Sequence, residues 1–126
     1  MKSKIILTQA APAPIGPYSQ AVLSGDFLFC SGQIAIDPKN GEVLKGSVAE
    51  QTELVMKNIS ALLTEAKLNF SDVVKTTIYL TNMNDFAQVN EVYAKYFKAN
   101  PPARSTSAVA ALPKAVNVEI EVIARA

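Results

Sequence analysis

Arg104 is the residue of this sequence best suited to binding a small anion. The chain has ten lysines but only two arginines, and the other arginine, Arg125, is the penultimate residue. Arg104 closely follows Pro101 and Pro102, and two successive prolines fix φ and deliver the next residues in one direction. A guanidinium held in that way is a planar fork that fits a carboxylate or a phosphate. The alternative is a solvated arginine, because surface ion pairs contribute little.

Glu119 is the second candidate, a carboxylate inside an otherwise apolar strand near the C-terminus. Alternation alone would predict that this side chain faces solvent, and that is the alternative interpretation. If oligomerisation buries that face, the carboxylate loses water, and it then needs a partner or a raised pKa.

A third candidate group lies earlier in the chain, around Tyr18, Ser31 and Gly32. Glycine at position 32 permits a ligand to approach the backbone closely. Tyr18 either forms a wall of a site or is a half-buried aromatic whose hydroxyl binds the main chain.

The absence of histidine excludes several kinds of catalytic site. Without histidine there is no Ser-His-Asp or Cys-His nucleophile pair. One cysteine, Cys30, cannot provide a zinc site or an intrachain disulfide, and a small buried thiol is its favoured interpretation. Glycine-rich phosphate motifs are also missing. Catalysis would therefore use carboxylates, tyrosine, lysine, arginine, hydroxyls, backbone groups and water.

Length and charge indicate one domain that does not bind nucleic acid or membranes. A chain of 126 residues with a net charge of +1 has no clustered basic face of the kind that nucleic acids require. No apolar run approaches the roughly 20 residues needed to span a bilayer. No secretory signal is recognisable, so we expect a cytoplasmic protein.

The first half of the chain combines strand patterns with one long helix. Strands are predicted at residues 19–24 and 27–34, joined at a Gly25-Asp26 turn, and a second turn is predicted at residues 37–41. Apolar residues at three- and four-residue spacing predict a helix over residues 47–67. Ser47 and Glu50 have the spacing of a capping box at its start.

The second half predicts a strand, a helix and two further strands. Residues 73–80 are β-branched, and Asn82 or Asn84 can cap a helix that continues until Pro101 stops it. The last strand alternates clearly from residue 118 to 125. This order predicts an α+β sheet with two helices on one face. Because Ile123 shares a face with Glu119, we also expect a homo-oligomer whose sheets pack together.

Several motifs together resemble the RidA (YjgF) family. The resemblance runs in order from about residue 5 to residue 124 and involves residues 15–21, 31–33, 74–80, 90–93, 102–105 and 118–121. It implies a single RidA-like domain over residues 1–126, with a chorismate-mutase-like fold assembled as a homotrimer. It also implies clefts between subunits.

The resemblance implies a deaminase as well. Family members like this chain hydrolyse 2-aminoacrylate, 2-iminopropanoate and 2-iminobutanoate to 2-oxo acids and ammonia, which protects enzymes that use pyridoxal phosphate. They need no metal or organic cofactor. The alternative is a non-catalytic module that binds a small metabolite in the same cleft, or a holdase. A ribonuclease is disfavoured because histidine and a basic patch are missing.

The family's site residues map onto matching positions of this chain. Arg104 would clamp the substrate carboxylate, and Glu119 would hold the attacking water or transfer its proton. The pocket-lining positions are Tyr18, Ser31, Gly32, Asn90 and Thr106. Two positions depart from the usual pattern, since Thr106 replaces a cysteine and Ser107 replaces an apolar residue. Cys30 is not at the family's cysteine position and does not inherit its role.

Overall fold

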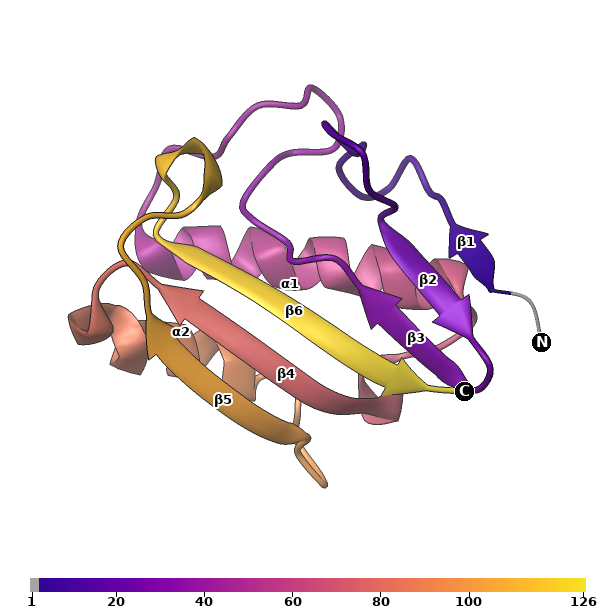
Figure 1. Cartoon of the computed structure of the whole chain (residues 1–126). Coiled ribbons are helices and arrows are strands. Elements are labelled where there is room, and N and C mark those ends of the chain that lie inside the picture. The colour runs from indigo at the N-terminus through magenta and orange to yellow at the C-terminus, as the bar shows by residue number, and fades with distance from the viewer. Residues whose placement is uncertain (1–2) are drawn as a thin grey trace.

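The computed structural model describes residues 3–126, which form a six-stranded sheet with both long helices on one face (Figure 1). The order of strands across the sheet is β1-β2-β3-β6-β4-β5. The predicted α+β arrangement with two helices on one face is confirmed. The strands are β1 (Lys4–Ile6), β2 (Ala21–Ser24), β3 (Phe27–Cys30), β4 (Val73–Leu80), β5 (Ala103–Ala108) and β6 (Val118–Arg125), and the helices are α1 (Val48–Glu65) and α2 (Phe86–Ala94).

Helix α1 begins at a capping box, as predicted. The Ser47 hydroxyl accepts from the Glu50 amide at 3.1 Å, and the Glu50 carboxylate accepts from the Ser47 amide at 2.9 Å. The helix buries Val55, Ile59 and Leu62 against the sheet. Within residues 3–126, neither this helix nor any other is long and apolar enough to cross a membrane.

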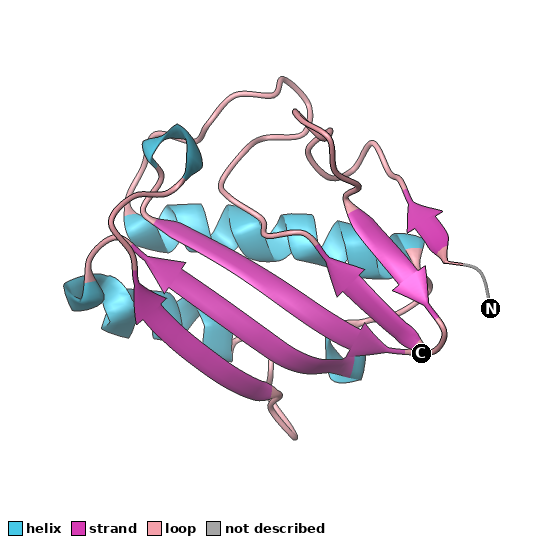
Figure 2. Ribbon diagram, in the orientation of Figure 1, coloured by secondary structure: helices cyan, strands magenta, loops and turns pink. Residues whose placement is uncertain are grey.

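The side chains of the central strands β4 and β6 alternate between the face covered by the helices and the uncovered face. These strands pair antiparallel, with Ile78 opposite Ile120, while β5 pairs parallel to the other side of β4. Because side chains alternate along a strand, Thr76, Ile78 and Leu80 face the helices and are fully buried. Tyr79, of the opposite parity, projects from the other face of the sheet. Figure 2 shows no helix on that face.

The uncovered face carries apolar side chains. Phe29 pairs with Ile123 and Phe27 with Arg125, which places both phenylalanine rings on the face shared with Glu119. These two rings are 46% and 41% exposed, respectively. An exposed apolar patch of this kind is typical of an interface. Coverage by a further copy of the chain stays a prediction.

Three details of the secondary structure differ from the prediction. Strand β1 was not predicted, because three residues give too short a pattern. The strand expected over residues 27–34 ends at Cys30, and the following residues join the sheet only through a bridge between Gln33 and Ile120. Helix α2 ends at Ala94 instead of continuing to Pro101, because the amides of Tyr96 and Phe97 bind carbonyls three residues back and tighten the turn.

Gln20 fixes the proline-rich loop that precedes β2. Its side chain is 2% exposed and makes four hydrogen bonds to the main chain of residues 8–12. The amide oxygen accepts from the Thr8 amide at 2.8 Å, and the amide nitrogen donates to the carbonyl of Pro12, also at 2.8 Å. A loop that cannot form regular structure is therefore held by one side chain.

Replacing Gln20 with leucine is expected to lower the free energy of unfolding by about 2 kcal/mol or more, because several main-chain groups lose their buried partner. Urea unfolding followed by circular dichroism measures this change. Leu23→Ala in the adjoining strand β2 removes apolar surface only, so it should leave amide exchange in residues 8–12 unchanged. If the amides of residues 8–12 exchange as slowly in Gln20→Leu as in the unaltered protein, other contacts hold the loop.

Candidate active site

Arg104 lies on β5 with its side chain over α2. Nη1 donates to Oδ1 of Asn90 at 2.7 Å. The guanidinium carbon lies 5.0 Å from the ring centroid of Tyr93 and 5.3 Å from that of Phe86. Both distances are within the range of cation–π interactions. The sequence identified Arg104 and Asn90 but did not identify the two aromatic rings as its neighbours.

The surroundings of Arg104 form an open, partly apolar hollow, which we call the arginine half-site. Its volume is about 430 Å³, and the prolines that precede Arg104 form part of its wall. Among residues 3–126 no carboxylate pairs with the guanidinium, so its charge is available to an external anion. Thr106, two residues further along β5, shares the face of Arg104. The lining residues are Asn90, Tyr93, Ala94, Phe97, Pro101, Pro102 and Arg104.

Glu119 lies on the opposite side of the molecule, beside Gly32. Two backbone hydrogen bonds, from the Gln33 amide to the Ile120 carbonyl at 2.8 Å and from the Ile120 amide to the Gln33 carbonyl at 3.1 Å, bring these segments together. A methyl group at position 32 would lie 2.1 Å from Oε2 of Glu119. The sequence attributed Gly32 to the approach of a ligand, whereas here the Glu119 carboxylate occupies that space.

The environment of Glu119 favours its protonated form. Half-burial raises the pKa of this carboxyl above its usual value, and the negative charge of Glu121 raises it further. Glu121 shares the same face of β6 and accepts a hydrogen bond from the Tyr79 hydroxyl at 2.8 Å. A raised pKa makes the carboxylate a stronger base toward a bound water than an ordinary glutamate.

Gly32→Ala is expected to lower activity by displacing the Glu119 carboxylate rather than by unfolding the chain. The measurement is kcat for the imine hydrolysis that the family resemblance implies, together with a thermal unfolding curve. A double-mutant cycle gives the control, because Gly32→Ala should cost little further activity in a Glu119→Ala background. If the losses of activity from the two substitutions are additive, Gly32 does not act through Glu119.

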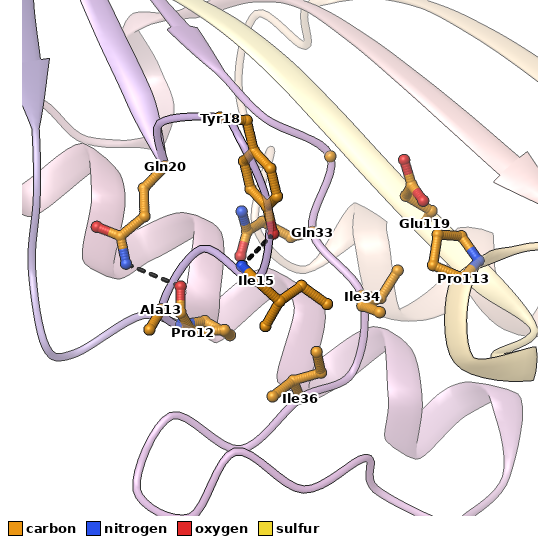
Figure 3. A pocket seen from close by; sticks show the side chains of 11 residues that line it. Pro12, Ala13, Ile15, Tyr18, Gln20, Gln33, Ile34, Ile36, Pro113 and Glu119 are labelled. Carbon is orange, nitrogen blue, oxygen red and sulfur yellow. Dashed lines mark hydrogen bonds between the residues drawn. The ribbon is translucent and has the colours of Figure 1, made fainter.

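A second cavity lies beside Glu119, and we call it the carboxylate half-site (Figure 3). It has a volume of about 230 Å³. Isoleucine and proline provide five of its eleven lining residues, and Glu119 lies at one end. This combination fits a small ligand with an apolar side chain and one reactive polar centre. The lining residues are Pro12, Ala13, Ile15, Tyr18, Gln20, Gly32, Gln33, Ile34, Ile36, Pro113 and Glu119.

Tyr18 and Ser31 use their hydroxyl groups within the chain. The Tyr18 hydroxyl accepts from the Ile15 amide at 3.3 Å, as the dashed line in Figure 3 shows, while its ring is half exposed and lines the cavity. The Ser31 hydroxyl donates to the Ser19 carbonyl at 2.6 Å. The Tyr18 hydroxyl therefore binds the main chain, and a role for its ring as a wall of a substrate site stays a prediction. The neighbouring Cys30 is buried, and burial raises the pKa of its thiol to about 12, so it is unreactive.

The arginine and carboxylate half-sites do not meet within one subunit. Arg104 pairs with Thr76 of β4, whereas Glu119 pairs with Tyr79, three residues away. An odd separation along a strand reverses the face, so the two side chains project from opposite faces of the sheet. Their strands also lie on either side of β4, about 10 Å apart. A site that uses both residues requires a second copy of the chain.

Known proteins resemble this chain over nearly its whole length. The family model described as Endoribonuclease L-PSP matches residues 8–126. The chain belongs to the RidA family. A RutC family protein of Pyrococcus horikoshii is 54% identical over 121 residues, which cover 96% of each chain. The human 2-iminobutanoate/2-iminopropanoate deaminase is 49% identical over 121 residues, covering 96% of this chain and 88% of the human protein.

Solved structures of RidA-family relatives share the fold. The crystal structure of E. coli TdcF with bound serine is 45% identical, with a TM-score of 0.93, and each chain is covered to 98%. The chorismate-mutase-like fold implied by the motifs is thereby confirmed. Some relatives of about 50% sequence identity are named as deaminases, while others are named only by their family. Membership therefore supports imine deaminase activity and leaves the preferred substrate open.

Proposed function

We propose that this protein hydrolyses 2-imino acids to 2-oxo acids and ammonia. The substrates are 2-iminopropanoate, which is the tautomer of 2-aminoacrylate, and 2-iminobutanoate. Removing these reactive species protects the pyridoxal-phosphate enzymes that 2-aminoacrylate would otherwise attack. The observation that carries the proposal is Arg104, a guanidinium without a carboxylate partner among residues 3–126 and held by Asn90.

Arg104 is suited to the carboxylate of a 2-imino acid. Its fork can donate two parallel hydrogen bonds to one carboxylate, which fixes the position of C2 as well as the charge. The serine bound to the TdcF relative is a small amino acid with a carboxylate of the same kind. The apolar walls of the carboxylate half-site would accept the methyl or ethyl group of the substrate.

Glu119 is suited to accepting a proton from the attacking water. The water oxygen forms a bond to C2, the C=N π electrons move to nitrogen, and the carboxylate takes a proton from the water. Glu119 then returns this proton to the nitrogen. The C–N bond breaks as the hydroxyl oxygen forms the carbonyl and loses its proton, so both water protons leave with ammonia as ammonium. An iminium carbon is already electrophilic, so no strong nucleophile is required.

The complete site would form between copies of the chain, with Arg104 from one subunit and Glu119 from another. Their placement on opposite faces supports this arrangement. The exposed rings of Phe27 and Phe29 give the uncovered face an apolar surface to bury. A closed ring of three subunits would repeat one heterologous contact and create three equivalent sites.

The proposal is tested by coupling a serine or threonine dehydratase to the purified protein and following 2-oxo acid formation. Acceleration over the spontaneous rate supports the proposal. Binding of 2-oxobutanoate without acceleration would instead indicate a module that senses small metabolites. Failure of both tests would leave the deaminase function without support.

A further inference from the structure

We propose that Tyr93, anchored by Thr76, is a positioning residue that fixes the direction of the Arg104 guanidinium. This inference rests on the proposed function, because it explains how Arg104 is aimed at a substrate carboxylate. It assigns a role to two residues that would otherwise be described only as parts of the core.

Two aromatic rings support the guanidinium. The Tyr93 and Phe86 centroids lie 5.0 Å and 5.3 Å from the guanidinium carbon of Arg104. Both rings belong to the same helix, and Phe86, Asn90 and Tyr93 recur at the spacing of one helical face. Asn90 then takes one of the five N–H groups at 2.7 Å. The rings and Asn90 restrict the long arginine side chain while leaving its other donors available.

A buried hydrogen bond holds the Tyr93 ring in place. The Tyr93 hydroxyl lies 2.8 Å from the Thr76 hydroxyl. Tyr93 is 5% exposed and Thr76 is fully buried, so neither group can exchange this bond for one to water. The Tyr93 ring also packs against Phe97, at a centroid distance of 4.7 Å.

These contacts form a closed ring that starts and ends at Arg104. Thr76 is the register partner of Arg104 in the β4–β5 pair, so the two backbones are fixed to each other. Strand pairing joins the Arg104 backbone to Thr76, and a hydrogen bond joins the Thr76 hydroxyl to Tyr93. A cation–π contact then joins the Tyr93 ring to the Arg104 guanidinium. The single hydroxyl pair therefore sets the distance between β5 and the surface on which the guanidinium lies.

Stability alone does not require this hydroxyl pair. Replacing both partners of a buried hydrogen bond with apolar groups of the same shape can be nearly neutral for stability. Thr76→Val combined with Tyr93→Phe keeps both shapes and the ring while removing both hydroxyls. A purely structural role predicts that this double variant folds and binds substrate normally, whereas a positioning role predicts weaker binding in a folded protein.

The experiment compares the double variant with the unaltered protein in thermal unfolding, in calorimetric titration with 2-oxobutanoate, and in imine hydrolysis. We expect nearly unchanged stability, about fivefold to tenfold weaker binding of 2-oxobutanoate, and a comparable rise in KM with a smaller change in kcat. Thr52→Val and Tyr96→Phe are matched controls, because each removes a hydroxyl of the same type away from Arg104. Neither control should change the affinity.

Normal affinity in the double variant, or an equal loss in the controls, would overturn the positioning role. An unaltered protein that does not bind 2-oxobutanoate would overturn it as well. If the unaltered protein binds 2-oxobutanoate but does not hydrolyse imines, the proposed function fails, and the titration still decides the role of Tyr93. The two proposals can therefore fail separately.

Discussion

Replacing Arg104 with alanine is expected to lower kcat/KM for 2-iminobutanoate by about 30- to 150-fold in a protein that remains folded. Charge-assisted hydrogen bonds of this kind contribute about 2 to 3 kcal/mol, and each 1.36 kcal/mol corresponds to about tenfold in rate. The guanidinium is exposed and supports no strand pairing with its side chain, so stability should change little. Steady-state kinetics in the dehydratase-coupled assay measure the effect.

Two variants test the geometry of this arginine. Arg104→Lys keeps the charge but loses the planar fork, so most of the activity should still be lost. Arg125→Ala removes the other arginine, which is 4.0 Å from Asp26 in a weak exposed pair and lies 5.9 Å from the centroid of the Phe27 ring. This variant should keep the kcat/KM of the unaltered protein. An Arg104→Lys variant with normal activity would show that only charge matters at this position.

Replacing Glu119 with glutamine is expected to change activity and stability in opposite directions. Loss of the proton-accepting carboxylate should lower kcat by about 100-fold. Glutamine keeps the shape but cannot become negatively charged beside Glu121, so the folded protein should become more stable at neutral pH. Chemical unfolding and steady-state kinetics on the same preparation measure both effects.

The pH dependence of these effects follows from the raised pKa of Glu119. Because burial and Glu121 raise this pKa in the folded state, the native protein binds the proton more tightly than the unfolded chain does. The stability of the unaltered protein therefore falls as pH rises from the ordinary glutamate pKa through the raised value, and Glu119→Gln lacks this fall. Activity should rise over the same range, because the ionised carboxylate is the proposed base.

Glu121→Gln separates the cause of the raised pKa from the carboxylate itself. Without the neighbouring negative charge, the pKa of Glu119 should fall, and the activity profile should shift toward lower pH. The buried position of Glu119 would still hold its pKa above the usual value. A profile that does not move would show that burial alone sets this pKa.

Local patterns were sufficient to predict most of the fold. The capping box at Ser47 and the alternation of β6 are signals within one segment, and the structure confirms both. Strand β1 was missed because it is ordered by pairing with β2, which a pattern of three residues cannot reveal. The end of α2 at Ala94 follows from the hydrogen bonds of the Tyr96 and Phe97 amides to carbonyls three residues back, which apolar spacing does not reveal.

The candidate site was predictable in its residue types but not in its arrangement. The proline-directed Arg104 and the carboxylate of Glu119 within a strand are visible in the sequence as chemical exceptions. Their placement on opposite faces depends on the registers of β4 with β5 and of β4 with β6, which no single segment encodes. For the same reason, the sequence did not reveal the contact of Gly32 with Glu119 or the aromatic support of Arg104.

The most direct test of the central claim combines two inactive variants in one assembly. Arg104→Ala and Glu119→Gln chains are refolded separately and together, and imine hydrolysis is measured for each. If each site takes Arg104 from one copy and Glu119 from another, random mixing should restore about one quarter of the unaltered activity. Separate samples should remain inactive. A mixed sample without recovered activity, although subunit exchange is demonstrated, would contradict a site shared between subunits.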